Sequence, residues 1–288
     1  MEGMSGTLKE SIMLHVEMER EPAVAGRFYP ADPQVLAEEV ASLLAERPDG
    51  RATAGPPRLA IGILAPHAGY MYSGPVAGAT YARVNVPDRV VVLCPNHTGV
   101  GKRVATWPDG AWATPLGRVQ VNEALTRELL ETGLAFPDRE AHRYEHSLEV
   151  QLPFLQLRNP EVSIAAVCLG PLSFDRCQEL GVQLARIARR HQALVVASSD
   201  MSHYLPAAVV REKDRMALDR VLALDPRGLH EVVSRQGISM CGYVPATVML
   251  VAAVEMGARE AELVRYATSG DATGDDRSVV GYAGVVVS

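Results

Sequence analysis

Three histidines in this sequence each follow a run of apolar residues of the kind that forms a buried strand. His67 follows LAIGILAP, His97 follows VVVLCPN, and His203 follows ALVVASSDMS. In open α/β sheets ligands bind beyond the carboxyl ends of the strands, and neutral imidazole is a common ligand for zinc, iron, copper and nickel. We therefore expect these three side chains to lie together and to bind one transition-metal ion.

A cysteine could complete this group. Cys241, in SMCGYVP, precedes an expected helix start at Pro245, where free backbone amides favour a thiolate. It could be a metal ligand, a nucleophile or a small buried hydrophobic residue. The other cysteines show no CxxC pairing and are interpreted as buried hydrophobic residues, a pattern that fits the reducing cytoplasm. They are Cys94, Cys168 and Cys177.

Two further stretches carry polar residues that could act beside a metal. In HRYEHSLEVQLPFL, His146 and Glu149 are spaced to share one face of a short helix before Pro153. They are interpreted either as acid–base or orienting groups near the metal, or as a surface pair on a helix capped by Ser147. Asp200 could bind the metal, cap a turn or, as we favour, orient an imidazole.

The surrounding pattern alternates short apolar runs with longer stretches of helical period, which is typical of one α/β domain with a sheet flanked by helices. Gly69, Gly74 and Pro75 are interpreted as turn residues after His67. Helices are expected to begin at Asp32-Pro33 and Asp225-Pro226, and over 122–133, 173–190, 207–224 and 246–256. Strands are expected over 59–64, 89–93, 162–169, 193–197, 262–268 and 279–287.

Composition excludes several classes of partner. The net charge is −6 and the 288 residues contain no long basic run, which argues against binding to nucleic acid. No apolar run approaches the roughly 20 residues needed to cross a bilayer. Residues 1–20 are charged throughout and lack the pattern of a secretory signal, so they are expected to form a flexible N-terminal extension before a domain over 21–288.

The strings APHAGYMYSG, CPNH, EHSLEVQLPFL, SSDMSHY and MCGYVP, in this order, resemble the Memo family, whose prokaryotic members are called AmmeMemoRadiSam system protein B. The resemblance covers about residues 21–288. It implies a fold similar to class III extradiol dioxygenases, with a mixed central sheet. It also implies metal-site residues at His67, His97, His203 and Cys241. Those dioxygenases bind Fe(II) through two histidines and a carboxylate, whereas here a cysteine stands where the carboxylate is expected.

The resemblance and the residues together favour two functions. The first is a metal-binding protein without proven turnover, acting with AMMECR-type and radical SAM partners, or holding a peptide or small molecule; eukaryotic Memo proteins are similar, acting through phosphotyrosine peptides. The second is a non-haem iron or copper oxidoreductase of dioxygenase type, in which His146 or His203 transfers protons. Iron is the favoured ion, with copper or zinc as alternatives.

Two less favoured alternatives stay open. A zinc hydrolase would use three protein ligands, a water molecule and a general base such as Glu149. Alternatively, Cys241 could act as a nucleophile with a histidine base and no metal. Metal analysis separates these alternatives.

Overall fold

A computed structural model describes residues 18–45 and 57–288 of the chain. These residues form an α/β domain around a mixed 12-stranded sheet, with neighbouring strands in the order β1-β5-β6-β8-β3-β9-β2-β12-β10. The centre of the sheet is parallel, because β8, β3, β9 and β2 pair in the same direction. Strand β12 is antiparallel to β2 and to β11. The fold class expected from the sequence is therefore confirmed.

Strands at the centre of the sheet are covered by helices on both faces, and their residues are accordingly apolar almost without interruption. The strands span Glu19–Arg20 (β1), Gly62–Ala65 (β2), Arg89–Pro95 (β3), Val104–Thr106 (β4), Ala111–Thr114 (β5), Gly117–Val121 (β6), Phe136–Pro137 (β7), Ser163–Leu169 (β8), Leu194–Ser198 (β9), His203–Leu205 (β10), Ala261–Thr268 (β11) and Val279–Val287 (β12).

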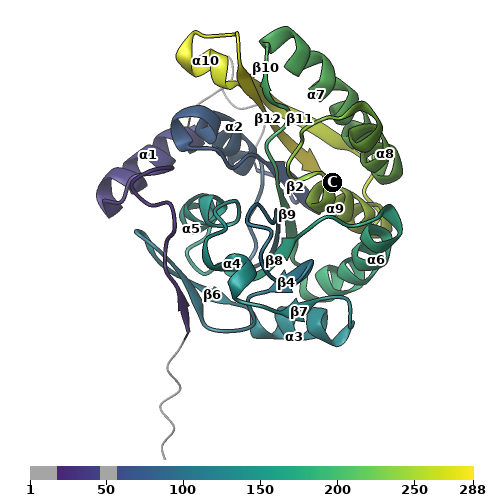
Figure 1. Cartoon of the computed structure of the whole chain (residues 1–288). Helices are drawn as coiled ribbons and strands as arrows, with labels where there is room; N and C mark the ends of the chain where they lie inside the picture. Colours follow the sequence, from purple (N-terminus) through teal and green to yellow (C-terminus); the bar gives the residue numbers. More distant parts are fainter. Residues whose placement is uncertain (1–17, 46–56) are drawn as a thin grey trace, which may run out of the picture.

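The helices divide between the two faces of the sheet (Figure 1). Helices α1, α2 and α5 pack together on one face, and α9 lies against the other face with α6 and α8 beside it. The helices span Pro33–Ala45 (α1), Tyr70–Ala82 (α2), Glu123–Glu131 (α3), Glu140–Arg143 (α4), Leu152–Arg158 (α5), Phe174–His191 (α6), Ala207–Leu222 (α7), Pro226–Gln236 (α8), Tyr243–Glu255 (α9) and Ser269–Thr273 (α10), with a 3₁₀ turn at Glu149–Gln151 (η1).

Helix α2 is the main element that the sequence pattern did not predict. Gly74 and Pro75, interpreted above as turn residues, lie inside this helix, and that interpretation is wrong. A side chain at Gly74 would come within 2.8 Å of Leu43 on α1, so the glycine permits close packing of two helices. Only Gly69 lies at the turn itself, as the N-cap of α2. Because most of α2 is buried, it lacks the polar face that would reveal a helical period.

Two residues of the expected N-terminal extension pair with the sheet. Of the extension expected over 1–20, residues 1–17 lie outside the described residues, whereas Glu19–Arg20 pair in parallel with Ala111 and Trp112 of β5. Arg20 is 2% exposed. The first described residues therefore belong to the sheet.

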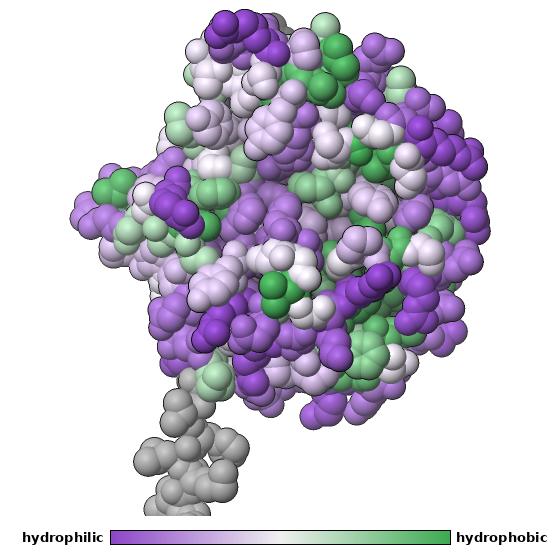
Figure 2. All heavy atoms as spheres, viewed as in Figure 1, coloured by the Kyte–Doolittle hydropathy of each residue, from purple (hydrophilic) through white to green (hydrophobic). Residues whose placement is uncertain are grey.

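Within residues 18–45 and 57–288, no helix combines the length and apolar character needed to cross a membrane. On the face shown in Figure 2, hydrophobic residues lie in small groups among hydrophilic ones.

Candidate metal centre

The predicted histidines follow three neighbouring parallel strands. His67 follows β2, His97 follows β3 and His203 follows β9, and β9 lies between the other two strands in the sheet. Because the three strands run in the same direction, their carboxyl ends meet at one edge of the sheet. The side chains of all three histidines line a single cavity there.

The tightest group of possible ligand atoms in the described residues combines His67 and His97 with His146, whose nitrogen atoms lie within 4.8 Å of one another. The ring centroids of His97 and His146 are 4.9 Å apart, and those of His67 and His146 are 5.5 Å apart. His146 comes from the loop between α4 and η1. A metal ion between three imidazoles at this spacing is chemically reasonable.

Hydrogen bonds fix which nitrogen of His67 can bind a metal. The hydroxyl of Ser198 donates its only proton to the carbonyl of Ser147 at 2.6 Å, so it must accept from Nδ1 of His67 at 2.9 Å. Gln151 also donates to Ser198, at 2.8 Å. His67 therefore carries its proton on Nδ1, and the lone pair on Nε2 is free for a ligand. Burial, followed by the neighbouring imidazoles, holds the pKa of His67 well below its usual value, which keeps the ring neutral.

A buried carboxylate orients the ring of His97. Glu145 accepts from Nδ1 of His97 at 2.8 Å and from its backbone amide at 2.6 Å. Burial alone would lower the pKa of His97, but the hydrogen bond and charge of Glu145 outweigh it and raise the pKa. Conversely, burial would raise the pKa of Glu145, but bonds from His97 and Ser147 hold it at about 2. A carboxylate that receives Nδ1–H of an imidazole is the usual support of a metal-binding histidine.

His203 is oriented in the same way but stands apart from the tight group. Its Nδ1 donates to the carbonyl of Ser239 at 2.9 Å, and its amide donates to the Ser239 hydroxyl at 2.8 Å. The lone pair on Nε2 is therefore free as well. His203 is not one of the three residues whose ligand atoms cluster within 4.8 Å.

Cys241 and Asp200 also lie close to Nε2 of His67. The Cys241 sulfur is 3.3 Å from Nε2 of His67, and a carboxylate oxygen of Asp200 is 4.0 Å from the same nitrogen. Asp200 also accepts from the His67 amide at 2.8 Å, which agrees with an orienting role. Burial raises the pKa of Asp200 to about 6, and burial with the nearby Asp200 charge raises the pKa of the Cys241 thiol. A metal that binds this sulfur must displace its proton.

Glu149 does not face the metal group. Its carboxylate is fully buried and accepts from Tyr29 at 2.5 Å, from the amides of Ala23 and Val24 at 2.8 and 3.0 Å, and from Arg20. The expected pairing of His146 and Glu149 on one helical face is not what the structure shows, because only Glu149–Gln151 form a short 3₁₀ turn here. We therefore assign Glu149 to holding the N-terminal residues in place.

The cavity extends well beyond the metal group. Its volume is about 930 Å³, which is enough for a small organic molecule or part of a peptide. Aromatic side chains line it together with hydroxyl groups and one arginine, Arg27. The aromatic residues are Phe28, Tyr72, Tyr204 and Tyr282.

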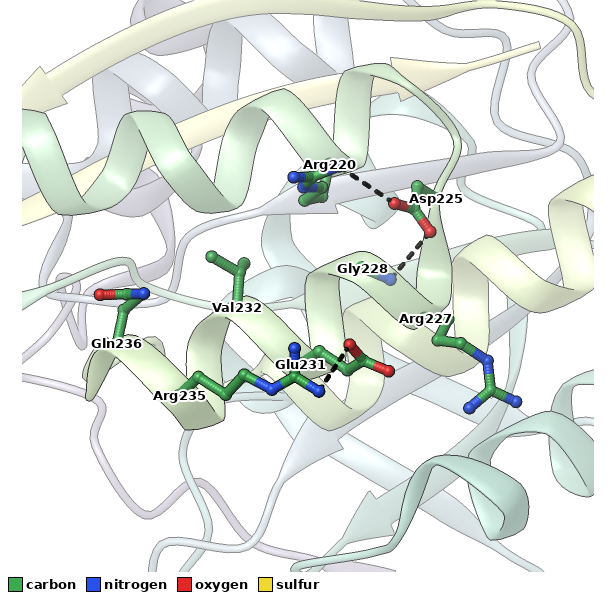
Figure 3. A pocket seen from close by; sticks show the side chains of 8 residues that line it. All are labelled: Arg220, Asp225, Arg227, Gly228, Glu231, Val232, Arg235 and Gln236. Atoms are coloured by element: carbon green, nitrogen blue, oxygen red, sulfur yellow. Dashed lines mark hydrogen bonds and ion pairs between the residues drawn. The ribbon is translucent and has the colours of Figure 1, made fainter.

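A second, smaller pocket of about 370 Å³ lies between α7 and α8 (Figure 3). It also contains charged side chains, but they form pairs with one another at the surface. Arg220 lies 3.4 Å from Asp225, and Arg235 lies 3.2 Å from Glu231. Each of these two carboxylates faces an arginine, neither histidine nor cysteine lines the pocket, and we assign no site to it.

Several supporting residues were not predicted from the sequence. Glu145, Ser198 and Gln151 orient His67 and His97 through bonds between residues far apart in the chain. The one available signal was the carboxylate immediately before His146 in YEHSLE, since a buried acid beside a histidine often supports a metal site.

Comparison with known proteins agrees with the motifs. The family model described as Memo-like protein matches residues 20–286. A MEMO1 family protein of Methanopyrus kandleri is 43% identical over 285 residues, covering 93% of this chain and 99% of that protein. A MEMO1 family protein of Aquifex aeolicus is 41% identical, covering 93% of this chain and 98% of its own length.

A solved structure is similar in fold alone. The crystal structure of an uncharacterised protein from Escherichia coli K12 superimposes with a TM-score of 0.52 at 12% identity, covering 80% of this chain and 100% of that chain.

Proposed function

The chain belongs to the Memo family, and we propose that it binds one transition-metal ion between His67, His97 and a third ligand from the same cavity. One observation carries this proposal. His67 and His97 each donate Nδ1–H to a buried acceptor, which leaves Nε2 free in a group of three imidazoles. Metal-binding imidazoles almost always donate their second ring N–H to such an acceptor.

The third ligand would come from His146, Cys241 or Asp200, all of which lie beside the first two. His203, which lines the same cavity, would complete the set. When bound, the ion would act as a Lewis acid or a redox centre. Imidazole with thiolate suits iron, copper or zinc, and we favour iron.

The size of the cavity supports a second candidate function, a metal-dependent oxidoreductase. A bare metal-storage site would need little space, whereas about 930 Å³ beside the imidazoles leaves room for a substrate. In this function His146 or His203 would accept or deliver protons, and Asp200 would hold His67 in place. Burial first of all lowers the pKa of His146, so its ring is neutral at neutral pH.

The partners inferred from the resemblance are also proposals. We propose that the protein acts in the cytoplasm with an AMMECR-type protein and a radical SAM protein, or holds a peptide in the cavity. All four cysteines are free, which suits a reducing compartment. Affinity purification from the native host tests this proposal, and recovery of neither partner would count against it.

The direct test is element analysis of protein purified without oxygen, repeated on Cys241→Ser. The proposal expects close to one iron, copper or zinc ion per chain in the natural protein. A protein that holds no transition metal, even after reconstitution, would refute it. A Cys241→Ser variant that keeps the same metal with equal affinity would remove Cys241 from the ligand set. Oxygen uptake with catechols and related compounds then separates the oxidoreductase from a binding protein.

A further inference from the structure

Residues 19–29, which we call the anchor segment, contact two of the elements that carry the histidines of the metal group. Arg20 lies at the start of this segment, and Arg27 and Phe28 near its end line the metal cavity. Nothing in the sequence pattern marked this segment as part of the site.

Arg20 donates hydrogen bonds to the loop that carries Glu145 and His146. It is 2% exposed and donates to the carbonyl of Glu145 at 2.6 Å and to the carbonyl of His142 at 3.2 Å. It also forms a buried ion pair with Glu149, and its guanidinium lies over the Trp112 ring at 4.6 Å. A guanidinium presents several donors in a fixed plane, so one side chain fixes three points of the loop.

Glu149 binds the anchor segment at several further points. It accepts from the amides of Ala23 and Val24 and from the Tyr29 hydroxyl, in addition to Arg20. All four donors belong to residues 20–29. The charge is buried and fully hydrogen-bonded, which is the condition under which a buried ion pair specifies one conformation.

The end of the segment reaches the histidines themselves. The Phe28 ring packs edge-on against His146, with centroids 4.8 Å apart. The Phe28 carbonyl accepts from the amide of Tyr70 at 2.7 Å, immediately after the turn that carries His67. The anchor segment therefore contacts both the loop of His146 and the turn of His67, and it adds to the direct bonds from Tyr70 to Val150 and from Gln151 to Pro66.

Building on the proposed metal site, we infer that Arg20 and Glu149 are positioning residues for it. The buried pair fixes the anchor segment against the loop of Glu145, which keeps Glu145 on His97 and Phe28 against His146. Loss of the pair would let the imidazoles move apart without removing any ligand. Supporting residues of this kind change metal affinity by about 10–100-fold.

The test compares Co(II) affinity, measured by titration of metal-free protein, with the thermal stability of the same samples. Arg20→Met alone leaves a buried carboxylate without its partner and could prevent folding. The double variant Arg20→Met, Glu149→Gln removes both charges and avoids that problem. The matched control is Arg58→Met, which breaks a partly buried pair with Glu262 at 2.6 Å that lies outside the cavity.

We expect the double variant to bind Co(II) at least about tenfold more weakly at a temperature where it is fully folded. The control should change by less than about twofold. A folded double variant with affinity equal to that of the natural protein would overturn the inference, since a purely structural pair would lower only the melting temperature.

Hydrogen exchange separates this inference from the metal proposal. In metal-free protein, the amides of Tyr70 and Ser147 should exchange faster in the double variant than in Arg58→Met, because they depend on the anchor segment and on Glu145. If the natural protein binds no Co(II), the metal proposal fails. The exchange rates alone then decide whether Arg20 and Glu149 position the histidine loop. Unchanged rates at both amides would overturn the positioning role, and faster rates would support it.

Discussion

The metal cavity and the pocket between α7 and α8 both gather ionisable side chains, but they hold them in different ways. In the α7–α8 pocket, Arg235 is 73% exposed and pairs with Glu231 on the same helix. In the cavity, Glu145 is fully buried and holds His97 through two hydrogen bonds. Surface pairs of the first kind contribute little and can rearrange. A buried acceptor such as Glu145 fixes the orientation of the imidazole and keeps its proton on Nδ1, which is what a metal-binding histidine requires.

The largest effect is expected when one of the histidines with a buried hydrogen-bond acceptor is removed. His67→Ala should weaken metal binding by about 4 kcal/mol, about a thousandfold, because a site with four ligands is worth about 10–16 kcal/mol. Titration with zinc or Co(II) measures this. His191→Ala, which removes a histidine paired with Glu128 away from the cavity, is the control and should leave the affinity unchanged. Equal effects of the two changes would contradict the account.

A smaller effect is expected when the carboxylate that orients His97 is changed and His97 itself is kept. Glu145→Gln removes the charge that faces Nδ1 of His97 and should lower metal affinity by about 10–100-fold. Glu140→Gln changes an exposed carboxylate nearby and should have no effect. If both variants bind metal like the natural protein, buried support is not what distinguishes the cavity.

Replacing the sulfur of Cys241 tests whether this residue is a metal ligand. Cys241→Ser should lower the affinity for Co(II) by about tenfold and remove the thiolate-to-metal absorption band, because an alcohol is a harder and weaker donor. An identical absorption spectrum for both proteins would show that Cys241 is not a ligand.

The buried acid beside His67 should make the stability of metal-free protein depend on pH. Burial raises the pKa of Asp200 to about 6 in the folded protein, against a value near 4 in the unfolded chain. The stability that the raised pKa contributes to the folded protein is therefore fully present below about pH 4 and is lost as the pH rises through about 6. Asp200→Asn cannot ionise. Melting temperatures from pH 4 to 7 should therefore fall for the natural protein relative to this variant, by a few degrees. A constant difference across this range would contradict the raised pKa.

The smallest effect is expected in the α7–α8 pocket. Arg235→Gln removes an exposed pair with Glu231 and should change the free energy of unfolding by less than about 0.5 kcal/mol. Metal affinity should not change. A loss of metal binding here would show that the two regions are connected.

Local patterns were sufficient for much of the fold. Strands β3, β8, β9, β11 and β12 and helices α1, α3, α6, α7, α8 and α9 lie where apolar runs and capping residues predicted them. Asn122, Ser173 and Asp225 each cap a helix with the side chain, as expected. These signals depend on neighbouring residues, so one sequence is enough to read them.

The supporting contacts could not be predicted in the same way. Arg20 and Glu149 are 129 positions apart, and His67 meets Ser198 across 131 positions. Their partners are set by how β2, β3 and β9 lie side by side, which the residue pattern alone does not determine. The sequence therefore predicted that histidines would lie together. The structure showed that His146 joins the tightest group, and that Ser198 and Glu145 orient His67 and His97.

The most direct measurement is a crystal structure of protein loaded with metal and recorded at the absorption edge of that metal. We expect one anomalous peak within about 2.0–2.2 Å of Nε2 of both His67 and His97, with Nδ1 of each ring still bonded to Ser198 and Glu145. A peak bound through either Nδ1, or a peak outside this cavity, would contradict the account.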